Sequence, residues 1–205
     1  MEPKKVAIIG AGVSGLVACK FTLSKGFIPI VFEARGDIGG VWTETLQTTA
    51  LQTPKKLYEF SDFPWPKSVT EDFPKYDKVL DYIKSYADHF GLLKHIRFNT
   101  KVLSIDCEGC SNEELEGWTL WGGTGEAFSE RRKWRINVVD ARTNVPLEVS
   151  LSLLLLTTTT RKYHFSSKKW KRGSAVGPTF NNFTFSSYII LPFFFLLNQK
   201  LIFKI

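Results

Sequence analysis

A glycine triplet between two apolar runs constrains the fold more than any other feature of this chain. Residues 10–15 read Gly-Ala-Gly-Val-Ser-Gly, which is the spacing G-x-G-x-x-G. Residues 6–9 before it form a continuous apolar run with the length of a buried parallel strand. Apolar residues then recur at helical spacing up to residue 25, and residues 27–32 form a second apolar run. This order of strand, glycine turn, helix and strand predicts a βαβ unit.

The context of the triplet gives each glycine a physical role. Gly10 permits a tight turn, Gly12 lets the backbone approach a pyrophosphate, and Gly15 lets the helix pack on the strand. The helix N-terminus offers free N–H groups and partial positive charge to phosphates. Glu33 stands 18 positions after Gly15, at the end of the second apolar run. A carboxylate there favours an unphosphorylated adenosine ribose, which predicts FAD or NAD as the cofactor.

A second glycine pair helps to choose between these two cofactors. Residues 33–42 read Glu-Ala-Arg-Gly-Asp-Ile-Gly-Gly-Val-Trp, so the pair follows shortly after the acid. Small residues at this point let a loop lie against an extended cofactor. The combination resembles FAD-dependent two-dinucleotide oxidoreductases, and Gly-Gly-x-Trp resembles flavin-containing and Baeyer–Villiger monooxygenases in particular.

Further motifs lengthen the resemblance. Residues 51–55 (Leu-Gln-Thr-Pro-Lys) and 60–66 (Phe-Ser-Asp-Phe-Pro-Trp-Pro) are similar to the segment that follows the first FAD motif in flavin-containing monooxygenases. Trp-x-x-Trp-Gly-Gly at residues 118–123 and Lys-Trp-Arg at 133–135 resemble plant members. The chain is therefore identified as a plant-like member of this family, over roughly residues 4–148.

The resemblance implies a chemistry and a set of cofactor-binding residues. NADPH reduces bound FAD, and one oxygen atom of O2 passes to a small nitrogen or sulfur nucleophile. No nucleophilic or acidic side chain is required, so we assign no catalytic residue. Arg35 is a further candidate, for the adenosine phosphates, although an isolated base is as often solvated surface. The residues that the resemblance assigns to FAD are Gly10, Ala11, Gly12, Val13, Ser14, Gly15, Glu33, Gly39, Gly40, Val41, Trp42 and Gln52.

Two motifs of the family are missing from the sequence. One is Phe-x-Gly-x-x-x-His, and the other is the second G-x-G-x-x-G/A, which binds NADPH. We therefore expect this chain to stop before the enzyme is complete and to be inactive by itself. Two other interpretations stay open: a non-catalytic FAD-binding fragment, and an FAD amine oxidase or disulfide oxidoreductase. Cys107-x-x-Cys110 favours the last of these, but its turn-rich, acidic context favours a surface loop and no metal site.

Charge and composition divide the chain near residue 149. The net charge is +7, but the last acid is Glu148 and eight bases follow it. The 19 bases before that point balance the 20 acids, so we expect no nucleic-acid partner. Eight of the 17 phenylalanines also lie beyond this point, without any period. We divide the chain into an FAD-binding domain at 1–149 and a basic, aromatic, poorly structured tail at 150–205.

The remaining pattern completes the expected α/β, Rossmann-like fold with a small β insertion. Residues 34–76 lack a sustained period, which predicts loops with short helical pieces. Residues 78–90 form an amphipathic helix with Asp77 as its N-cap. Strands are expected around residues 96–98, 118–121 and 134–140. We find no secretory signal and no clear membrane segment, which favours a cytoplasmic location.

Overall fold

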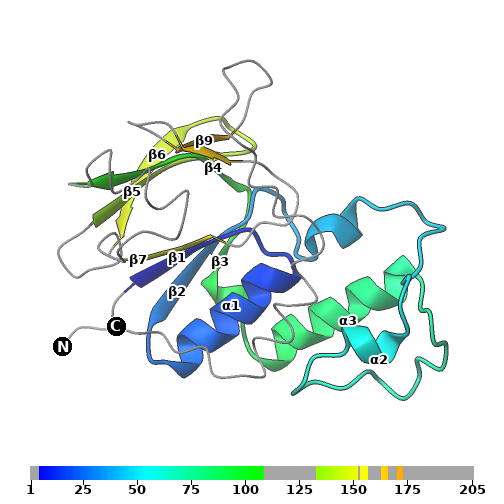
Figure 1. Cartoon of the computed structure of the whole chain (residues 1–205). Coiled ribbons are helices and arrows are strands. Elements are labelled where there is room, and N and C mark those ends of the chain that lie inside the picture. The colour runs from blue at the N-terminus through cyan, green and yellow to red at the C-terminus, as the bar shows by residue number, and fades with distance from the viewer. Residues whose placement is uncertain (1–4, 109–132, 152, 157–162, 166–169, 173–205) are drawn as a thin grey trace.

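The computed structural model describes residues 5–108, 133–151, 153–156, 163–165 and 170–172 (Figure 1). The described strands form two sheets, in the orders β3-β2-β1-β7 and β6-β5-β4-β9-β8. Helices α1 and α3 cover one face of the first sheet, and the second sheet lies against its other face (Figure 1). The predicted α/β fold class is therefore confirmed.

The βαβ unit at the start of the chain is present as predicted. Strand β1 (Lys5–Ile9) leads through the glycine turn into α1 (Val13–Ser24), and β2 (Ile28–Phe32) returns beside β1. The two strands are parallel, with Lys5 opposite Ile28 and Ile9 opposite Phe32. Two parallel neighbouring strands need a crossover connection, here α1, because a tight hairpin would make the second strand antiparallel to the first.

Strand β1 is apolar at consecutive positions because both of its faces are buried. Val6 and Ile8 belong to the core formed with α1 and α3. Ala7 and Ile9 belong to a second core, which they share with Phe32 and with the second sheet. A strand with only one buried face would alternate between apolar and polar residues. The continuous run therefore reports the position of β1 between two layers.

The segment after β2 contains short helical pieces, as predicted, before one long helix. The short pieces are η1 (Gly40–Thr43) and α2 (Lys55–Tyr58), and the long helix is α3 (Tyr76–His89). The short helix η2 (Leu93–His95) and the strand β3 (Ile96–Arg97) follow α3. Helix α3 begins before the predicted residue 78, and its N-cap is Lys75, which makes no side-chain cap. Asp77 instead lies in the first turn, where its charge is favourable to the helix dipole.

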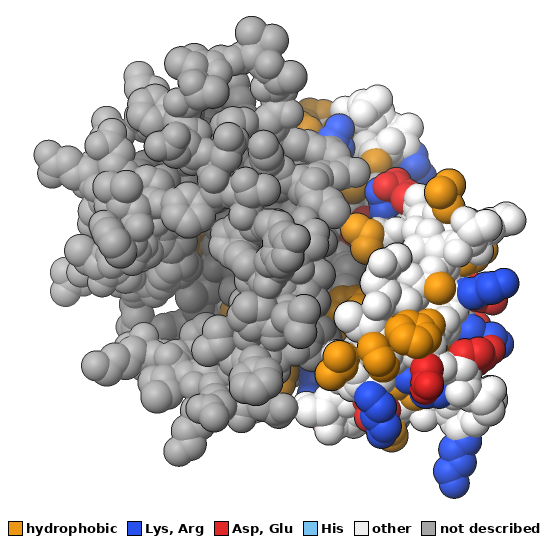
Figure 2. Space-filling view, turned by 45° about the vertical axis from the view of Figure 1, so that its right-hand side comes forward, with side chains coloured by type: hydrophobic (Ala, Val, Ile, Leu, Met, Phe, Trp, Pro, Cys, Tyr) orange, Lys and Arg blue, Asp and Glu red, His pale blue; other side chains and the backbone are white. Residues whose placement is uncertain are grey.

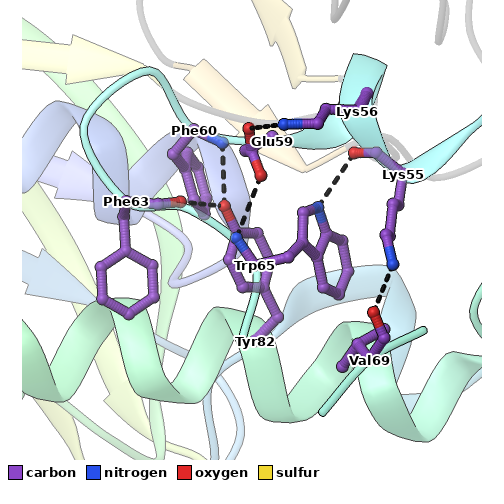
Figure 3. Close-up of polar contacts among 8 residues, drawn as sticks. All are labelled: Lys55, Lys56, Glu59, Phe60, Phe63, Trp65, Val69 and Tyr82. Carbon is purple, nitrogen blue, oxygen red and sulfur yellow. Dashed lines mark hydrogen bonds and ion pairs between the residues drawn. The ribbon is translucent and has the colours of Figure 1, made fainter. Parts of the chain in front are cut away.

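An aromatic cluster fastens the segment after α2 onto α3 (Figure 3). The Tyr82 hydroxyl accepts a hydrogen bond from the Phe60 N–H at 2.9 Å and donates one to the Phe63 carbonyl. Trp65 stacks on Tyr82 with ring centroids 3.9 Å apart, and its indole N–H donates to the Lys55 carbonyl at 2.9 Å. Helix α3 therefore holds the loop that lies beyond η1.

The second sheet contains several strands that the sequence pattern does not reveal. The antiparallel strands are β4 (Thr100–Glu108), β5 (Lys133–Asp140) and β6 (Pro146–Leu151). The predicted alternation of β5 is confirmed, since Trp134, Ile136 and Val138 are buried while Arg135 is exposed. In β4 the pairing register shifts between Val102 and Ser104, which breaks the period that would have revealed it. The strand expected at 118–121 lies outside the described residues.

The described residues within 150–205 form three further strands, β7 (Leu153–Leu156), β8 (Tyr163–Phe165) and β9 (Trp170–Arg172). Strand β7 pairs with β1 in parallel, with Val6 opposite Leu153 and Ile9 opposite Leu156. Strand β9 pairs with β4 in the second sheet. Strand β6 runs across the domain boundary placed at residue 149, and that boundary stays a prediction.

The surface of the described part carries both signs of charge. On the face in Figure 2, basic and acidic side chains lie next to one another, with apolar side chains between them. No helix among the described residues is both long enough and apolar enough to span a membrane.

Candidate functional site

The glycine turn lies at the edge of the parallel sheet where the strand order changes direction. From β1 the chain proceeds to β2 on one side, whereas β7 occupies the other side. In open α/β sheets, ligands bind beyond the carboxyl ends of the strands at such a switch point. The fold therefore places residues 10–15 where a ligand is expected.

The turn presents an open helix N-terminus. Gly10 has φ +92°, a backbone conformation that favours glycine, and its N–H donates to the Phe32 carbonyl at 2.9 Å. Gly12 is the N-cap of α1 and supplies no side-chain cap. The first N–H of α1 with an intrahelical partner is that of Leu16, which donates to Gly12 O at 3.0 Å. The N–H groups before it are available to an anion.

Glu33 joins the end of β2 to this turn. Its side chain is buried, with 8% of its surface exposed. One carboxylate oxygen accepts from the Ala11 N–H at 2.7 Å, and the other accepts from the Arg35 N–H at 2.9 Å. Each oxygen has a further lone pair, so the carboxylate can also accept from hydroxyl groups of a ligand.

The second glycine pair packs directly on the first motif. The Gly39 N–H donates to the Ala11 carbonyl at 3.0 Å. Gly39 and Gly40 have φ values of +125° and +60°, which favour glycine. A Cβ atom on Gly40 would approach the Gly12 Cα to 3.0 Å. The two segments can lie this close because Gly40 carries no side chain.

Arg35 contacts the same glycine pair. Its Nη1 donates to the Gly40 carbonyl at 3.1 Å and to the Thr43 hydroxyl at 3.0 Å. Its Nη2 forms an ion pair with Glu44. The guanidinium therefore lies against η1.

The remaining candidate residues lie further along the chain. The Trp42 indole N–H donates to the Tyr58 hydroxyl at 2.7 Å, and the two rings meet edge to face. Burial raises the pKa of Tyr58 to about 12, although the Trp42 hydrogen bond opposes the shift. Val41 and Gln52 are exposed. The structure thus brings residues 10–15, Glu33, Arg35, Gly39 and Gly40 together, with Trp42 turned to Tyr58.

Comparison with known proteins decides the family. The family model described as Flavin-binding monooxygenase-like matches residues 3–120, more than half of the 205-residue chain. The chain belongs to this family. The resemblance inferred from the sequence motifs is therefore confirmed.

Individual relatives agree with the assignment to the flavin-binding monooxygenases. Probable flavin-containing monooxygenase 1 of Arabidopsis thaliana is 52% identical over 140 residues, which are 67% of this chain and 26% of the relative. Flavin-containing monooxygenase 1 of Homo sapiens is 41% identical over 127 residues, covering 56% of this chain and 23% of that protein. The chain thus spans about a quarter of the length of these curated relatives.

Similarity to a solved structure bears only on the fold of this chain. S-allyl-L-cysteine S-oxygenase from Allium sativum has a TM-score of 0.58 at 19% identity. The match covers 75% of this chain and 36% of that protein.

The residues of this family member fit the phosphate and ribose of a flavin dinucleotide. Uncapped helix N–H groups suit a phosphate, and the absence of a Cβ at Gly12 leaves the backbone open to it. The Glu33 carboxylate suits a ribose diol. These groups lie side by side, since Glu33 accepts a hydrogen bond from Ala11 within the turn.

Sequence reasoning missed two residues of this site, Thr43 and Tyr58. The Thr43 hydroxyl donates to the Gly40 carbonyl at 2.7 Å, three residues before it. Threonine hydroxyls often form hydrogen bonds with nearby backbone groups. The position of Thr43 three residues after Gly40 was therefore a weak indication of this contact. The contact between Tyr58 and Trp42 spans 16 residues and left no local signal.

Other candidate groups do not form a site among the described residues. Burial raises the pKa of the Cys19 thiol to about 12, which keeps this buried group protonated. The Cys107 and Cys110 side chains lie outside the described part of the chain. No cluster of metal-ligating side chains occurs among the residues that the structure describes. A separate open hollow of about 370 Å³ is lined by Asp37, Ile38, Lys84, Ser85, Asp88 and Leu93.

Proposed function

We propose that this chain binds FAD, with the pyrophosphate at the N-terminus of α1 and the adenosine ribose at Glu33. The observation that supports this most is the 2.7 Å hydrogen bond from the Ala11 N–H to the Glu33 carboxylate. This hydrogen bond keeps Glu33, which we propose to bind the ribose, next to the turn that we propose to bind the pyrophosphate. The contacts we propose for the cofactor are made by Gly10, Ala11, Gly12, Val13, Ser14, Gly15, Glu33, Gly39, Gly40, Val41, Trp42 and Gln52.

We propose further that the FAD bound here serves an NADPH-dependent monooxygenase. FAD would supply the redox and oxygen chemistry, and the substrates would be O2 and a small nitrogen or sulfur nucleophile. The task of this chain is then to bind and orient the dinucleotide. The sequence holds a single G-x-G-x-x-G motif, so we assign no NADPH contact to any of its residues.

The test is a titration of the full 205-residue chain with FAD, in which flavin fluorescence reports binding. We expect FAD to bind saturably and ADP to displace it, because ADP has the same pyrophosphate and adenosine ribose as FAD. FMN lacks the adenosine and should not compete. The proposal fails if the folded chain binds no FAD, or if FMN displaces FAD as well as ADP does.

A matched pair of glycine variants localises the binding. In Gly12→Ala the new Cβ lies 3.5 Å from the Gly40 Cα, an ordinary contact, so the protein should fold. The same Cβ would lie between the backbone and the pyrophosphate, and we expect FAD binding to weaken roughly tenfold or more, about 1.4 kcal/mol. Gly36→Ala creates an equal 3.5 Å contact with Asn99 and should retain wild-type affinity.

Anaerobic addition of NADPH to the FAD-loaded chain separates the competing interpretations. An unchanged flavin spectrum favours an FAD-binding part without its own NADPH site, which the single glycine motif supports. Bleaching by NADPH favours a chain that carries out the reductive step itself. Bleaching by an amine or a thiol in the absence of NADPH favours an amine oxidase or a disulfide oxidoreductase.

A further inference from the structure

We propose that Arg35 is a positioning residue that, together with Thr43, holds Gly39 and Gly40 against the phosphate turn without contacting the cofactor. This inference rests on the proposed FAD site. It differs from the sequence-based expectation that Arg35 contacts the adenosine phosphates.

The first support is the convergence of two donors on one oxygen. The Gly40 carbonyl accepts from Arg35 Nη1 at 3.1 Å and from the Thr43 hydroxyl at 2.7 Å. Arg35 Nη1 also donates to the Thr43 hydroxyl at 3.0 Å, which closes a triangle of hydrogen bonds. Two donors fix the orientation of the Gly40 peptide, and hydrogen bonds from a charged group are the stronger kind.

The second support is what lies on the other side of that peptide. Gly40 packs on Gly12, and the Gly39 N–H donates to the Ala11 carbonyl at 3.0 Å. Neither Gly39 nor Gly40 has a side chain that could hold the pair in place. This backbone is also costly to order, because glycine has more conformational freedom to lose than any other residue. The contacts that fix the pair must therefore come from neighbours.

The third support is the charge of the guanidinium. Its Nη2 forms an ion pair with Glu44, the residue directly after η1. The carboxylate of Glu44 therefore balances the positive charge of Arg35. The Glu44 side chain is 64% exposed, and exposed ion pairs stabilise proteins little. The hydrogen bond to Gly40 is the contact through which Arg35 would act on the site.

The experiment compares two test variants and their combination with two control variants in the full chain. Arg35→Lys keeps the charge but loses the planar fork that reaches both Gly40 and Thr43. Thr43→Val removes the second donor, and Thr43→Ser restores it. Thr45→Val is the matched control, because the Thr45 hydroxyl contacts Thr49 and not Gly40. The two readouts are FAD affinity and the exchange rate of the Gly39 amide in the cofactor-free protein, followed by NMR.

We expect Arg35→Lys and Thr43→Val each to weaken FAD binding and to speed up Gly39 exchange by about fivefold, the effect of one hydrogen bond. The double variant should lose less than the product of the two effects, because both act on one carbonyl. Thr43→Ser and Thr45→Val should match the wild type.

Three results would overturn the inference. Weakened FAD binding in Arg35→Lys with wild-type behaviour in Thr43→Val would mean that Arg35 contacts the cofactor itself. Unchanged Gly39 exchange in both variants would mean that the pair is held by other contacts. Equal acceleration throughout β1 and α1 would mean a general loss of stability. If the wild type binds no FAD, the proposed function fails, and Gly39 exchange still decides whether Arg35 holds the pair.

Discussion

At the scale of single residues, the two motifs require glycine for different physical reasons. Gly12 has an ordinary φ of −77°, so what its missing side chain provides is space. Gly39 has φ +125°, and its Cβ would lie 2.4 Å from Leu80 Cδ1 on α3. The sequence pattern identifies Gly12 from its spacing. It cannot reveal the contact with Leu80, which lies 41 positions away in the sequence.

Gly39→Ala should therefore destabilise the protein more than backbone strain alone requires. Gly26→Ala is the matched control, because Gly26 also has a positive φ of +78° but has nothing within 4 Å of its Cβ. We expect Gly39→Ala to lower the free energy of unfolding by about 1–3 kcal/mol more than Gly26→Ala, as overpacking does. Urea unfolding measures both. Equal losses would show that Leu80 moves aside without cost.

At the scale of elements, the sequence pattern predicts helix α3 but does not predict the contacts that this helix makes. The buried positions Val79, Ile83 and Ala87 follow helical spacing, as the amphipathic pattern predicts. The hydroxyl of Tyr82, however, bonds the backbone of Phe60 and Phe63, in a segment without any period. Loops held in place by side-chain contacts leave no periodic pattern in the sequence. This explains why residues 34–76 could be predicted only as loops with short helical pieces.

Tyr82→Phe isolates this contact, because it removes the hydroxyl and retains the ring that stacks on Trp65. We expect the free energy of unfolding to fall by about 1–2 kcal/mol, the usual effect of losing a buried hydrogen bond. Tyr76→Phe, at the first position of the same helix, removes a hydroxyl outside this network and should cost less than about 0.5 kcal/mol. A loss for Tyr82→Phe no larger than the control's would contradict the assigned role.

Three tyrosines of α2 and α3, two buried and one partly buried, also predict a loss of stability at alkaline pH. Burial raises the pKa of Tyr58 to about 12, and burial also raises the pKa values of Tyr82 and Tyr86. Unfolded tyrosines ionise near pH 10, so above that pH the unfolded state releases protons that the folded state retains. Stability is therefore complete below pH 10 and is lost as the pH rises toward 12.

Urea midpoints at pH 8 and pH 11 measure this loss. Tyr58 alone should account for roughly 1 kcal/mol at pH 11, one unit above its unfolded pKa. Tyr58→Phe cannot ionise, so its loss between the two pH values should be smaller by that amount. An equal loss in the two proteins would mean that the Tyr58 phenol ionises as freely in the folded state as in the unfolded state.

At the scale of the whole molecule, strand order determines where the site lies. The sequence reveals β1, α1 and β2 from their apolar periods, and with them the turn that carries the glycines. It does not reveal that residues 153–156 return to pair with β1, because a run of leucines specifies no partner. That pairing places a strand on each side of β1 and so creates the switch point at the glycine turn.

Amide NMR spectra of the full chain with and without FAD test whether FAD lies across the glycine turn and Glu33, as we propose. We expect the largest changes in amide chemical shift at Ala11, Gly12, Val13 and Ser14, with smaller changes at Ser85 and Asp88. The latter two residues line the separate hollow beside α3. Changes centred on that hollow, with unshifted signals from the glycine turn, would mean that FAD binds elsewhere.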